Sequence, residues 1–442
     1  MKISQLPDIP REWEIKQVRH IFNIHNGSTP KSGNPDFWNG DIDWITPDDL
    51  GSNAGKSITS SRRKITELGY KSCGVSLVPS GSIALSTRAP IGYVALTKMA
   101  ACVNQGCRIL VPKEGFPEYW YYSFISAKSL LVSLGQGTTF MELPRQSLAS
   151  VALPVPPLDE QKTIAHFLDH KTAQIDALIA KKQSLLDKLA EQRGASINQA
   201  VTKGLNDEVP MKESDIAWLG EIPRHWETKR LRFLMTMSGG LTPRTSEPRY
   251  WGGDIPWVSP KDMKSERLSS SIDMLTEDAL SETTLRLYPP GKVLIVVRGM
   301  ILAHTFPVAV NEVPVTVNQD MKVLETTMNP EYLAVLLRGI QSLVLSIVEE
   351  SAHGTKVLRT DLLKNIVLPV PPRVEQDEIV SEVARISSQI DKMVSTVTAA
   401  ITKLQEYRSA LITNAVTGKI DVRGWQPPAS TQAPEPAVAE AN

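Results

Sequence analysis

Residues 153–204, LPVPPLDEQKTIAHFLDHKTAQIDALIAKKQSLLDKLAEQRGASINQAVTKG, have a second copy in the same chain, from Leu368 to Lys419. The second copy also opens with LPVPP, continues into a Glu-Gln pair and closes on Ala-Val-Thr. Gln161 and Gln376, one from each pair, lie 215 positions apart, and the other matches keep that offset. A match held in one register over this length indicates an internal duplication.

Each copy is predicted to form one long helix after its prolines, because proline fits the first turn of a helix and not its interior. In the second copy the apolar residues are spaced alternately four and three apart, which is typical of a coiled coil. They are Ile379, Val383, Ile386, Ile390, Met393, Val397, Ala400, Leu404, Tyr407 and Leu411. The first copy has Ile164, Leu168, Ile175, Leu178, Leu185 and Leu189, interrupted by Lys171, Lys182, Gln192 and Ser196. We therefore expect the two helices to pair with each other; two separate core helices are the alternative.

The duplication also covers the residues before each helix. Residues 9–50 match 222–263 at an offset of 213, with Trp13 opposite Trp226 and Gly40-Asp41-Ile42 opposite Gly253-Asp254-Ile255. Thr29-Pro30, Trp38 and Trp44 recur in the same way. The chain is thus one unit used twice, a globular domain followed by a long helix.

Within each globular part, short apolar runs bounded by Gly and Pro are predicted to be strands. They are SIALST, YVALT and CRILV in the first part and KVLIVVR, PVAVNEVPVTV and MKVLE in the second. Helices are predicted where Pro117 and Pro330 open apolar stretches. Strands and helices do not alternate, so the fold class expected is α+β.

The expected organisation follows from these patterns. It is a first globular domain over 1–155, a central long spacer helix over 156–206, a second globular domain over 207–368, a C-terminal long spacer helix over 369–422 and a disordered tail over 423–442, whose composition cannot bury a core.

The composition argues against a membrane-spanning protein and against an exported one. The chain has 442 residues, of which 41% are hydrophobic and 22% charged, and it contains no apolar run of about 18 residues. It begins without the apolar segment of a signal peptide. Its three cysteines form no zinc-type pairs, so we expect free thiols and a cytoplasmic location.

Net charge is zero, with 48 basic and 48 acidic residues, so any binding of nucleic acid must use clustered faces. The first domain is mildly basic, with 16 basic and 12 acidic residues over 1–155. The second is mildly acidic, with 18 basic and 21 acidic residues over 207–368.

No catalytic motif is complete. GSNAGKS at 51–57 is one residue short of a P-loop, and His166 and His170 lack the glutamate of a zinc protease motif. Glu-x-Lys occurs in both units without a suitable upstream acidic residue, and no [DNS]PP[YF] or GxGxxG motif is present. We therefore expect no catalytic residue, no cofactor site and no metal site in this chain.

Basic side chains in loops and at strand ends are the remaining candidates for function, because Arg can bind guanine and Lys can bind phosphate. Exposed surface and internal ion pairs are the alternatives. Two threonines in Gly-Thr loops could meet phosphate through backbone N–H groups, or simply form turns. The candidate DNA-binding residues are Lys31, Lys56, Arg62, Arg63, Lys64, Arg88, Thr138, Arg244, Arg249, Lys261, Lys264, Arg267, Arg298 and Thr355.

The order of these motifs, with TP and WxGDIxW leading to LPVPPxxEQ and a helix ending in AVT, all present twice, closely resembles the specificity subunits of type I restriction-modification enzymes. The resemblance implies that each domain reads one half of a split, asymmetric site in double-stranded DNA. It also implies that the two helices pack antiparallel with pseudo-two-fold symmetry and set the spacer between the half-sites.

The partners implied are two methyltransferase subunits, which methylate adenine with S-adenosylmethionine, and ATP- and Mg-dependent restriction subunits. The alternatives are a coiled-coil scaffold for protein partners and a stand-alone DNA-binding protein. Genes for the partner subunits beside this one would favour the first interpretation.

Overall fold

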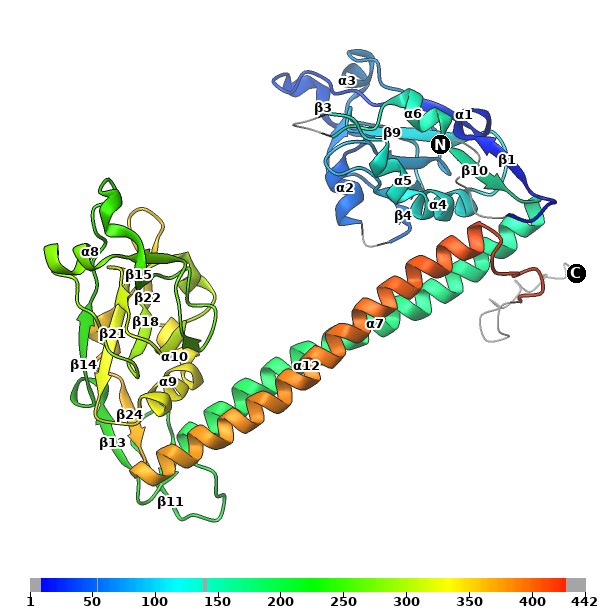
Figure 1. The fold of residues 1–442 in the computed structure, drawn as a ribbon. Coiled ribbons are helices and arrows are strands. Elements are labelled where there is room, and N and C mark those ends of the chain that lie inside the picture. Colours follow the sequence, from blue (N-terminus) through cyan, green and yellow to red (C-terminus); the bar gives the residue numbers. More distant parts are fainter. Residues whose placement is uncertain (1–8, 54, 138–140, 427–442) are drawn as a thin grey trace, which may run out of the picture. The chain divides into compact units, whose positions relative to one another are not determined.

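The computed structural model describes residues 9–53, 55–137 and 141–426. The chain divides into two compact units. Unit 1 contains the residues up to 182 together with those from 399 onwards, and unit 2 contains residues 183–398. Each unit therefore combines one globular domain with parts of both long helices, which Figure 1 labels α7 and α12.

The domain of unit 1 is built on two sheets. The first has the strand order β2 (Phe22–Asn26), β9 (Cys107–Pro112), β6 (Ile83–Ser86), β7 (Val94–Thr97) and β4 (Ser57–Ile58). Its neighbours are antiparallel except for β4, which runs parallel to β7. The second sheet places β3 (Trp38–Ile45) between β5 (Lys64–Ile65) and β8 (Ala101–Val103). The strands predicted from SIALST, YVALT and CRILV are thus confirmed.

Short elements complete this domain. Helix α4 (Pro117–Ser126), opened by the predicted proline, packs against β6 and β7. Strand β1 (Glu14–Gln17) pairs with β10 (Ala152–Val155), which leads directly into the long helix. The remaining elements are α1 (Val18–Ile21), η2 (Pro35–Phe37), α2 (Pro47–Ser52), α3 (Glu67–Lys71), α5 (Lys128–Ser133) and α6 (Arg145–Ser150).

The domain of unit 2 repeats this topology. Its five-stranded sheet has the order β14 (Met235–Gly239), β21 (Met321–Thr326), β18 (Val293–Val296), β19 (Val308–Asn311) and β16 (Arg267–Leu268). Its three-stranded sheet places β15 (Trp251–Val258) between β17 (Asp273–Leu275) and β20 (Thr316–Val317). Strand β13 (Glu227–Arg230) pairs with β24 (Val367–Val370), as β1 pairs with β10.

Two hairpins and several short helices accompany these sheets in unit 2. The hairpins are β11 (Met211–Glu213) with β12 (Glu221–Pro223), and β22 (Val348–Glu350) with β23 (Lys356–Leu358). The helices are η3 (Leu231–Phe233), η4 (Pro248–Tyr250), α8 (Glu277–Glu282), η5 (Met300–Ala303), α9 (Pro330–Gly339), α10 (Gln341–Leu345) and α11 (Thr360–Leu363).

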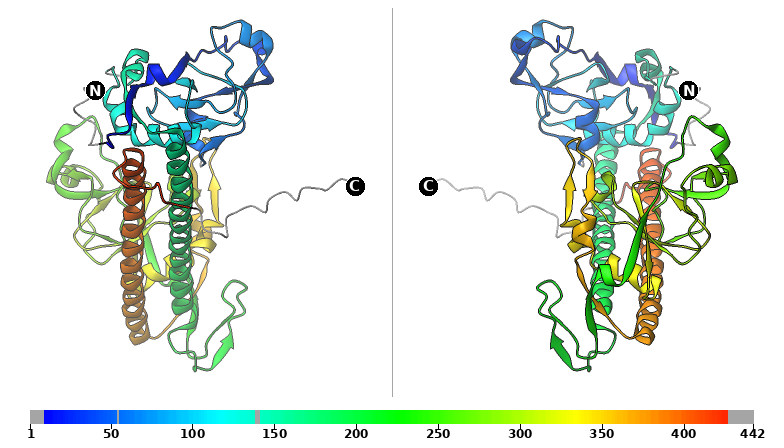
Figure 2. Two further views of the ribbon diagram at one scale, coloured as in Figure 1. Left: turned by 90° about the vertical axis from the view of Figure 1, so that its right-hand side faces the viewer. Right: turned by 90° about the vertical axis from the view of Figure 1, so that its left-hand side faces the viewer.

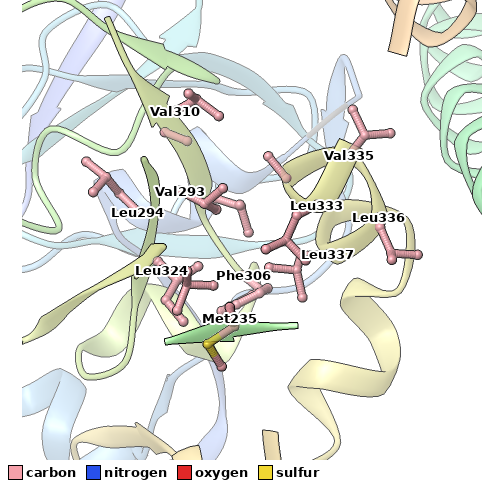
Figure 3. Packing of buried hydrophobic residues seen from close by; sticks show 14 of the residues in the cluster. Met235, Val293, Leu294, Phe306, Val310, Leu324, Leu333, Val335, Leu336 and Leu337 are labelled. Carbon is pink, nitrogen blue, oxygen red and sulfur yellow. The ribbon is translucent and has the colours of Figure 1, made fainter. Parts of the chain in front are cut away.

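The core of unit 2 lies between its larger sheet and helix α9. Figure 3 shows Val293 and Leu324 of the sheet on the side of Leu333 and Leu337 of the helix. All four side chains are fully buried. Burial of apolar side chains such as these is the main stabilising contribution to each domain.

The long helices are α7 (Leu158–Lys203) and α12 (Arg373–Val416), which lie side by side in Figures 1 and 2. Within each unit they run antiparallel, because Asp176 pairs with Arg408 and Arg193 pairs with Asp391. Both helices are shorter than the predicted ranges 156–206 and 369–422. Two prolines precede each first turn, and Gly204 and Gly418 take positive φ just after the helices end.

The apolar seam predicted for α12 is only partly buried. Ile379, Ile390 and Leu411 are buried, whereas Met393 is 44% exposed and Tyr407 is 58% exposed. On α7, Leu178 and Leu185 are also exposed. Two helices shield only a narrow stripe of each other, so part of the apolar surface of the pair remains in contact with water.

The Glu-Gln pair of each repeat joins the long helix to its domain. Gln161 donates to the carbonyl of Pro156 at 2.8 Å and accepts from the backbone N–H of Phe116, just before α4, at 2.8 Å. Gln376 makes the same two contacts with Pro371 and Asn329. Both glutamines are buried, so each amide satisfies backbone groups that would otherwise be unpaired.

The glutamate of each pair accepts a hydrogen bond from a repeated tryptophan. The indole of Trp13 donates to Glu160 at 3.1 Å, and the indole of Trp226 donates to Glu375 at 2.8 Å. The IPxxW motif and the PPxxEQ motif are therefore two halves of one contact, although 147 residues separate them in the first repeat.

The Ala-Val-Thr motif that closes each helix supports the other repeat's domain. Tyr119 of α4 donates to the carbonyl of Val416 at 3.2 Å, and Tyr332 of α9 donates to the carbonyl of Val201 at 3.4 Å. Both tyrosines are fully buried, and burial raises the pKa of each hydroxyl, which therefore remains protonated as a donor. Each unit is thus completed by the end of the helix that belongs to the opposite repeat.

The α+β class and the pair of antiparallel long helices are confirmed. None of the helices described by the structure is long and apolar enough to cross a membrane.

Candidate nucleic-acid interface

The loop that carries the TP motif is held against the smaller sheet in the same way in both domains. In unit 1 the backbone of Ser28 donates to Val103 at 3.0 Å and accepts from the indole of Trp44 at 2.9 Å. In unit 2 Leu241 makes both contacts, with Val317 and with Trp257. The repeated tryptophans thus fix the backbone of the TP loop in both domains.

Glycine is required where this loop crosses the neighbouring turn. A Cβ atom on Gly27 would lie 1.7 Å from the carbonyl oxygen of Asn104, and one on Gly240 would lie 1.9 Å from that of Val317. No side chain fits at such distances, so the backbones themselves are in contact.

A repeated Asn-Gln turn lies between the TP loop and the strand-end arginine. Thr29 donates to Gln105, and Thr242 donates to Gln319, so the turn is fixed to the TP loop. One residue further, the carbonyl of Gly106 accepts from the backbone N–H of Arg88 at 3.2 Å. In unit 2 the carbonyl of Asp320 accepts from the N–H of Arg298 at 3.3 Å.

The strand-end arginine in turn lies beside the Gly-Thr loop. Arg88 forms an isolated β-bridge with Glu142, and Glu142 forms a second bridge with Gln136, which directly precedes Gly137. In unit 2 Arg298 bridges to Val357 of β23, on the hairpin that turns at Gly354 and Thr355. Four features that are distant in the sequence are thus contiguous in each domain, in unit 1 as far as Gly137. We call the TP loop, the Asn-Gln turn, the strand-end arginine and the Gly-Thr loop together the loop surface.

A pair of perpendicular tryptophans lies next to the TP loop of each domain. The ring centroids of Trp38 and Trp44 are 5.1 Å apart at 79°, and those of Trp251 and Trp257 are 5.2 Å apart at 87°. The indole of Trp38 donates to the carbonyl of Lys31, and that of Trp251 donates to Arg244. This contact places the predicted residues Lys31 and Arg244 at equivalent positions on the two domains.

One basic residue of SSRRK, Arg63, lies against the tryptophan pair in unit 1. The guanidinium of Arg63 lies 3.7 Å from the ring centroid of Trp38, where a cation is attracted to the face of the indole. Lys64 pairs with Asp43 at 3.3 Å, and the side chain of Arg62 is exposed. Arg63 is thereby preorganised, with its outer N–H groups available to a ligand.

Unit 2 has different chemistry at the same place. The strand position equivalent to Arg63 is Asp273, which lies 3.9 Å from Lys261. Arg249 pairs with Glu282 at 2.7 Å, and the charge of that carboxylate is the main cause that raises the pKa of the arginine. The same backbone framework therefore presents a positive charge beside the tryptophan pair in unit 1, and both a positive and a negative charge there in unit 2.

The predicted residues fall into three groups. Lys31, Arg62, Arg63, Arg244, Lys264 and Arg298 form no ion pair within the described part of the chain. Lys64, Arg88, Arg249, Lys261 and Arg267 lie within 4 Å of carboxylates, Arg88 with Glu142 at 3.7 Å and Arg267 with both Glu312 and Glu331. Lys56 pairs with Asp169 of the long helix at 2.6 Å.

Of the two predicted threonines, one lies in the described part of the chain. Thr355 lies in the β22–β23 hairpin, where its carbonyl accepts from the N–H of Ser351 at 2.9 Å. Thr138 lies outside the described residues.

The candidate residues predicted from the sequence do not include Gln105 and Gln319, which belong to an Asn-Gln pair present in both repeats. They likewise do not include Asp273. The repeated Asn-Gln was the available signal, since a polar pair recurring in both copies has a shared role in the framework.

Among residues 9–53, 55–137 and 141–426, no group of three or more His, Cys, Asp or Glu side chains could hold a metal ion. Cys102 and Cys107 are buried, and burial raises the pKa of Cys102 to about 12, so its thiol stays neutral.

The family model described as the type I restriction modification DNA specificity domain matches residues 10–187 and again residues 223–403. The chain belongs to the type I restriction-modification specificity family. The two matches coincide with the two repeats, and this confirms the resemblance inferred from LPVPPxxEQ and its duplication.

Curated relatives of the specificity family are similar over most of the chain. The type I restriction enzyme MjaIX specificity subunit of Methanocaldococcus jannaschii is 30% identical over 438 residues, which cover 95% of this chain and 96% of that protein. The EcoBI specificity subunit of Escherichia coli is 23% identical over 342 residues, covering 74% and 70%. A specificity subunit is a non-catalytic component of its enzyme, in agreement with the absence of a complete catalytic motif.

Solved structures of the family share the fold. A chain from a study of complex assembly and conformational transition of the type I R-M system aligns with a TM-score of 0.67 at 16% identity, covering 94% of this chain and all of that chain. The HsdS subunit from Thermoanaerobacter tengcongensis aligns with a TM-score of 0.52 at 16% identity, covering 94% and 99%.

Proposed function

We propose that this specificity subunit reads a bipartite, asymmetric site in double-stranded DNA, with one half-site bound by each domain. The observation that carries the proposal is that the loop surface and the tryptophan pair beside it are built by the same hydrogen bonds in both units. The side chain beside the tryptophan pair differs, since it is Arg63 in unit 1 and Asp273 in unit 2. A shared framework favours the same kind of ligand. Different charges at matched positions favour two different base sequences.

The recognition domains correspond to residues 1–155 and 207–368 in this proposal. Arg63, whose guanidinium lies on Trp38, and the exposed Arg62 and Lys31 are the proposed contacts of the first domain. Arg244, Lys264 and Arg298 are those of the second. Lys64, Arg88, Arg249, Lys261, Arg267 and Thr355 remain weaker predictions, since their polar groups have partners within the protein.

The two long helices are proposed to set the spacer between half-sites. A helix rises roughly 1.5 Å per residue, so the 46 residues of α7 extend on the order of 70 Å. Stiff, paired helices would fix the separation of the two reading surfaces and so select one spacing of half-sites.

Methyltransferase subunits are proposed to bind the paired helices. Leu178 and Tyr407 in unit 1, and Leu185 and Met393 in unit 2, leave large apolar side chains exposed on these helices. Exposed apolar surface of this kind is typical of a protein interface. Methyl transfer with S-adenosylmethionine and ATP- and Mg-dependent cleavage would then belong to the partner subunits, which reach a target adenine by flipping it from the duplex.

Footprinting of the purified chain with its methyltransferase subunit tests this function. We expect two protected segments of different sequence separated by an unread spacer, and methylated adenines of the host that fall in the same bipartite motif. A complex that assembles but protects DNA without sequence preference would contradict the recognition role. A chain that reads its site without any partner would contradict the assembly.

A further inference from the structure

Lys56 was predicted as a DNA contact, but the structure directs its ammonium group to the long helix. Its Nζ donates to Oδ1 of Asp169 on α7 at 2.6 Å, and its side chain is only 21% exposed. The ammonium also lies 5.0 Å from the ring centroid of Tyr122 and 5.8 Å from that of Tyr121, both on α4. The residue therefore passes over α4 and joins the edge of the recognition sheet to the helix.

Asp169 is held from a second direction. The hydroxyl of Tyr122 donates to the same oxygen at 2.7 Å and lies 3.3 Å from the hydroxyl of Thr172. Tyr122 and Thr172 are buried, and burial is the main cause that raises the pKa of the tyrosine, which stays a donor. The carboxylate of Asp169 thus accepts from a charged donor, Lys56, and from a buried donor, Tyr122. Charge-assisted and buried hydrogen bonds are stronger than exposed neutral ones.

The backbone of Lys56 is hydrogen-bonded to the sheet. Its carbonyl accepts from the N–H of Leu96 at 3.0 Å, and the next two residues form β4, which is parallel to β7. A movement of the recognition sheet relative to α7 must therefore break or stretch the contact between Lys56 and Asp169.

Unit 2 does not have this contact. The residue at the same register is Glu266, whose carbonyl accepts from Val310 just as that of Lys56 accepts from Leu96. Glu266 pairs with Arg338 of α9, inside its own domain, at 3.1 Å. The helix position 215 residues after Asp169 is Ala384, and the positions of Tyr121 and Tyr122 are Ala334 and Val335. The polar connection between sheet and long helix is thus specific to the first repeat.

We propose that Lys56 and Asp169 form a positioning contact that fixes the orientation of the first recognition domain on helix α7, and that this contact makes the subunit intolerant of altered half-site spacing. The inference rests on the proposed function. One extra base pair displaces a half-site by roughly 3.4 Å and rotates it by roughly 35°. Gln161 and Glu160 still hold the domain on its helix when this contact is lost, but the sheet is then freer to tilt and to follow part of that displacement.

The test uses the complex of the full chain with its methyltransferase partner and duplexes that carry the optimal spacer or one base pair more or fewer. Lys56→Met keeps the apolar stem on Tyr122 and removes the charge, and Asp169→Asn keeps the shape of the side chain. We expect wild type to bind the altered spacers on the order of tenfold more weakly than the optimal one, and either variant to reduce that ratio to roughly threefold. Affinity for the optimal spacer and the half-site sequences should stay unchanged.

Two further variants make the result specific. The exchange Lys56→Asp with Asp169→Lys should restore the wild-type ratio, because the ion pair is rebuilt in reverse. Glu266→Gln, which removes the ion pair at the same register of unit 2, should leave the ratio unchanged because Glu266 does not contact a long helix. A variant that fails to fold is identified by its circular dichroism, and Asp169→Asn, the smaller change, then decides.

Two outcomes would count against the idea in different ways. Variants that discriminate spacers as strictly as wild type would overturn the positioning role of Lys56 and leave the proposed function intact. A wild-type complex without any preference for a bipartite site would overturn the proposed function, and the inference with it.

Discussion

Arg408 of α12 donates from Nε and Nη2 to the two carboxylate oxygens of Asp176 on α7, at 2.9 and 3.2 Å. The duplicated pair, Arg193 of α7 with Asp391 of α12, joins the same helices in unit 2. Each arginine therefore pairs with the aspartate of the other repeat, which is possible only for antiparallel helices in one register. We interpret the two pairs as markers of register more than as sources of stability, since exposed ion pairs contribute little.

Reversing one charge should disturb the helix pair. We expect Asp176→Arg, which faces Arg408, to lower the free energy of unfolding by about 0.5 to 1 kcal/mol, and Asp176→Arg with Arg408→Asp to recover most of it. Urea denaturation followed by circular dichroism measures both, and Asp187→Arg is the control, because Asp187 forms no ion pair with the described residues of α12. Equal losses in the single and double variants would show that the pairing does not matter.

Shortening both helices by one heptad should shorten the spacer. Deleting 175–181 and 390–396 removes roughly 10 Å of helix rise from each, or about three base pairs of DNA. We expect the preferred spacer to fall by that amount while both half-site sequences are retained, as measured by binding to a spacer series. A change in the half-sites, or an unchanged spacer, would contradict the role of the helices as a ruler.

Trp226→Phe should destabilise unit 2 because it removes the hydrogen bond to Glu375. The indole of this fully buried residue donates to Glu375, and its loss leaves a partly buried carboxylate with one donor fewer. We expect a loss of about 1.5 to 3 kcal/mol, the usual range for a hydrogen bond to a charged group. Unfolding in urea measures it, and Glu378→Gln, one helical turn further along the same helix, should have almost no effect. If Trp226→Phe unfolds like wild type, the hydrogen bond is not important.

Gly240→Ala should disrupt the TP loop of the second domain. The new methyl group would lie 1.9 Å from the carbonyl oxygen of Val317, so the loop must move. We expect DNA binding to fall more than tenfold, with a loss of stability of about 1 to 3 kcal/mol from overpacking. Gly33→Ala is the matched control, because nothing lies within 4 Å of its Cβ position. Binding at the wild-type level would place the loop away from DNA.

Arg298→Ala tests the strand-end arginine. We expect a loss of about 1 to 3 kcal/mol in binding to the bipartite site and relaxed preference at one position of the second half-site, if the guanidinium contacts a base. A uniform loss with a shallower salt dependence would indicate a phosphate contact instead. Competition assays at two salt concentrations separate these outcomes, and Arg359→Ala, whose guanidinium is tied to Glu349 and Asp361, should bind normally.

The duplication, the long helices and most strands could be predicted because they depend on local patterns. LPVPP, the heptad spacing and the apolar runs around Ile83 and Val293 each determine one element without reference to the rest of the chain. The partners of side chains could not be predicted in this way. Whether a basic residue faces DNA or an internal carboxylate depends on which acid the fold brings near it, and Asp169, 113 residues away, gave no local sign that it would pair with Lys56.

The exposed positions of the seam show the same limit. Met393 and Ile390 follow the same heptad rule, yet one is 44% exposed and the other 3% exposed. The pattern determines which side of a helix is apolar, whereas the number and angle of its neighbours determine how much of that side is covered.

The support of each tyrosine by the opposite repeat has a consequence for damaged copies of the gene. Residues 411–416 pack in the core of unit 1 beside Trp13 and Tyr119, not in that of the domain that precedes them. A stop codon shortly before Leu411 would therefore leave the second domain whole and expose the interior of the first. A truncation at the C-terminal end of the second helix would therefore destabilise the N-terminal domain.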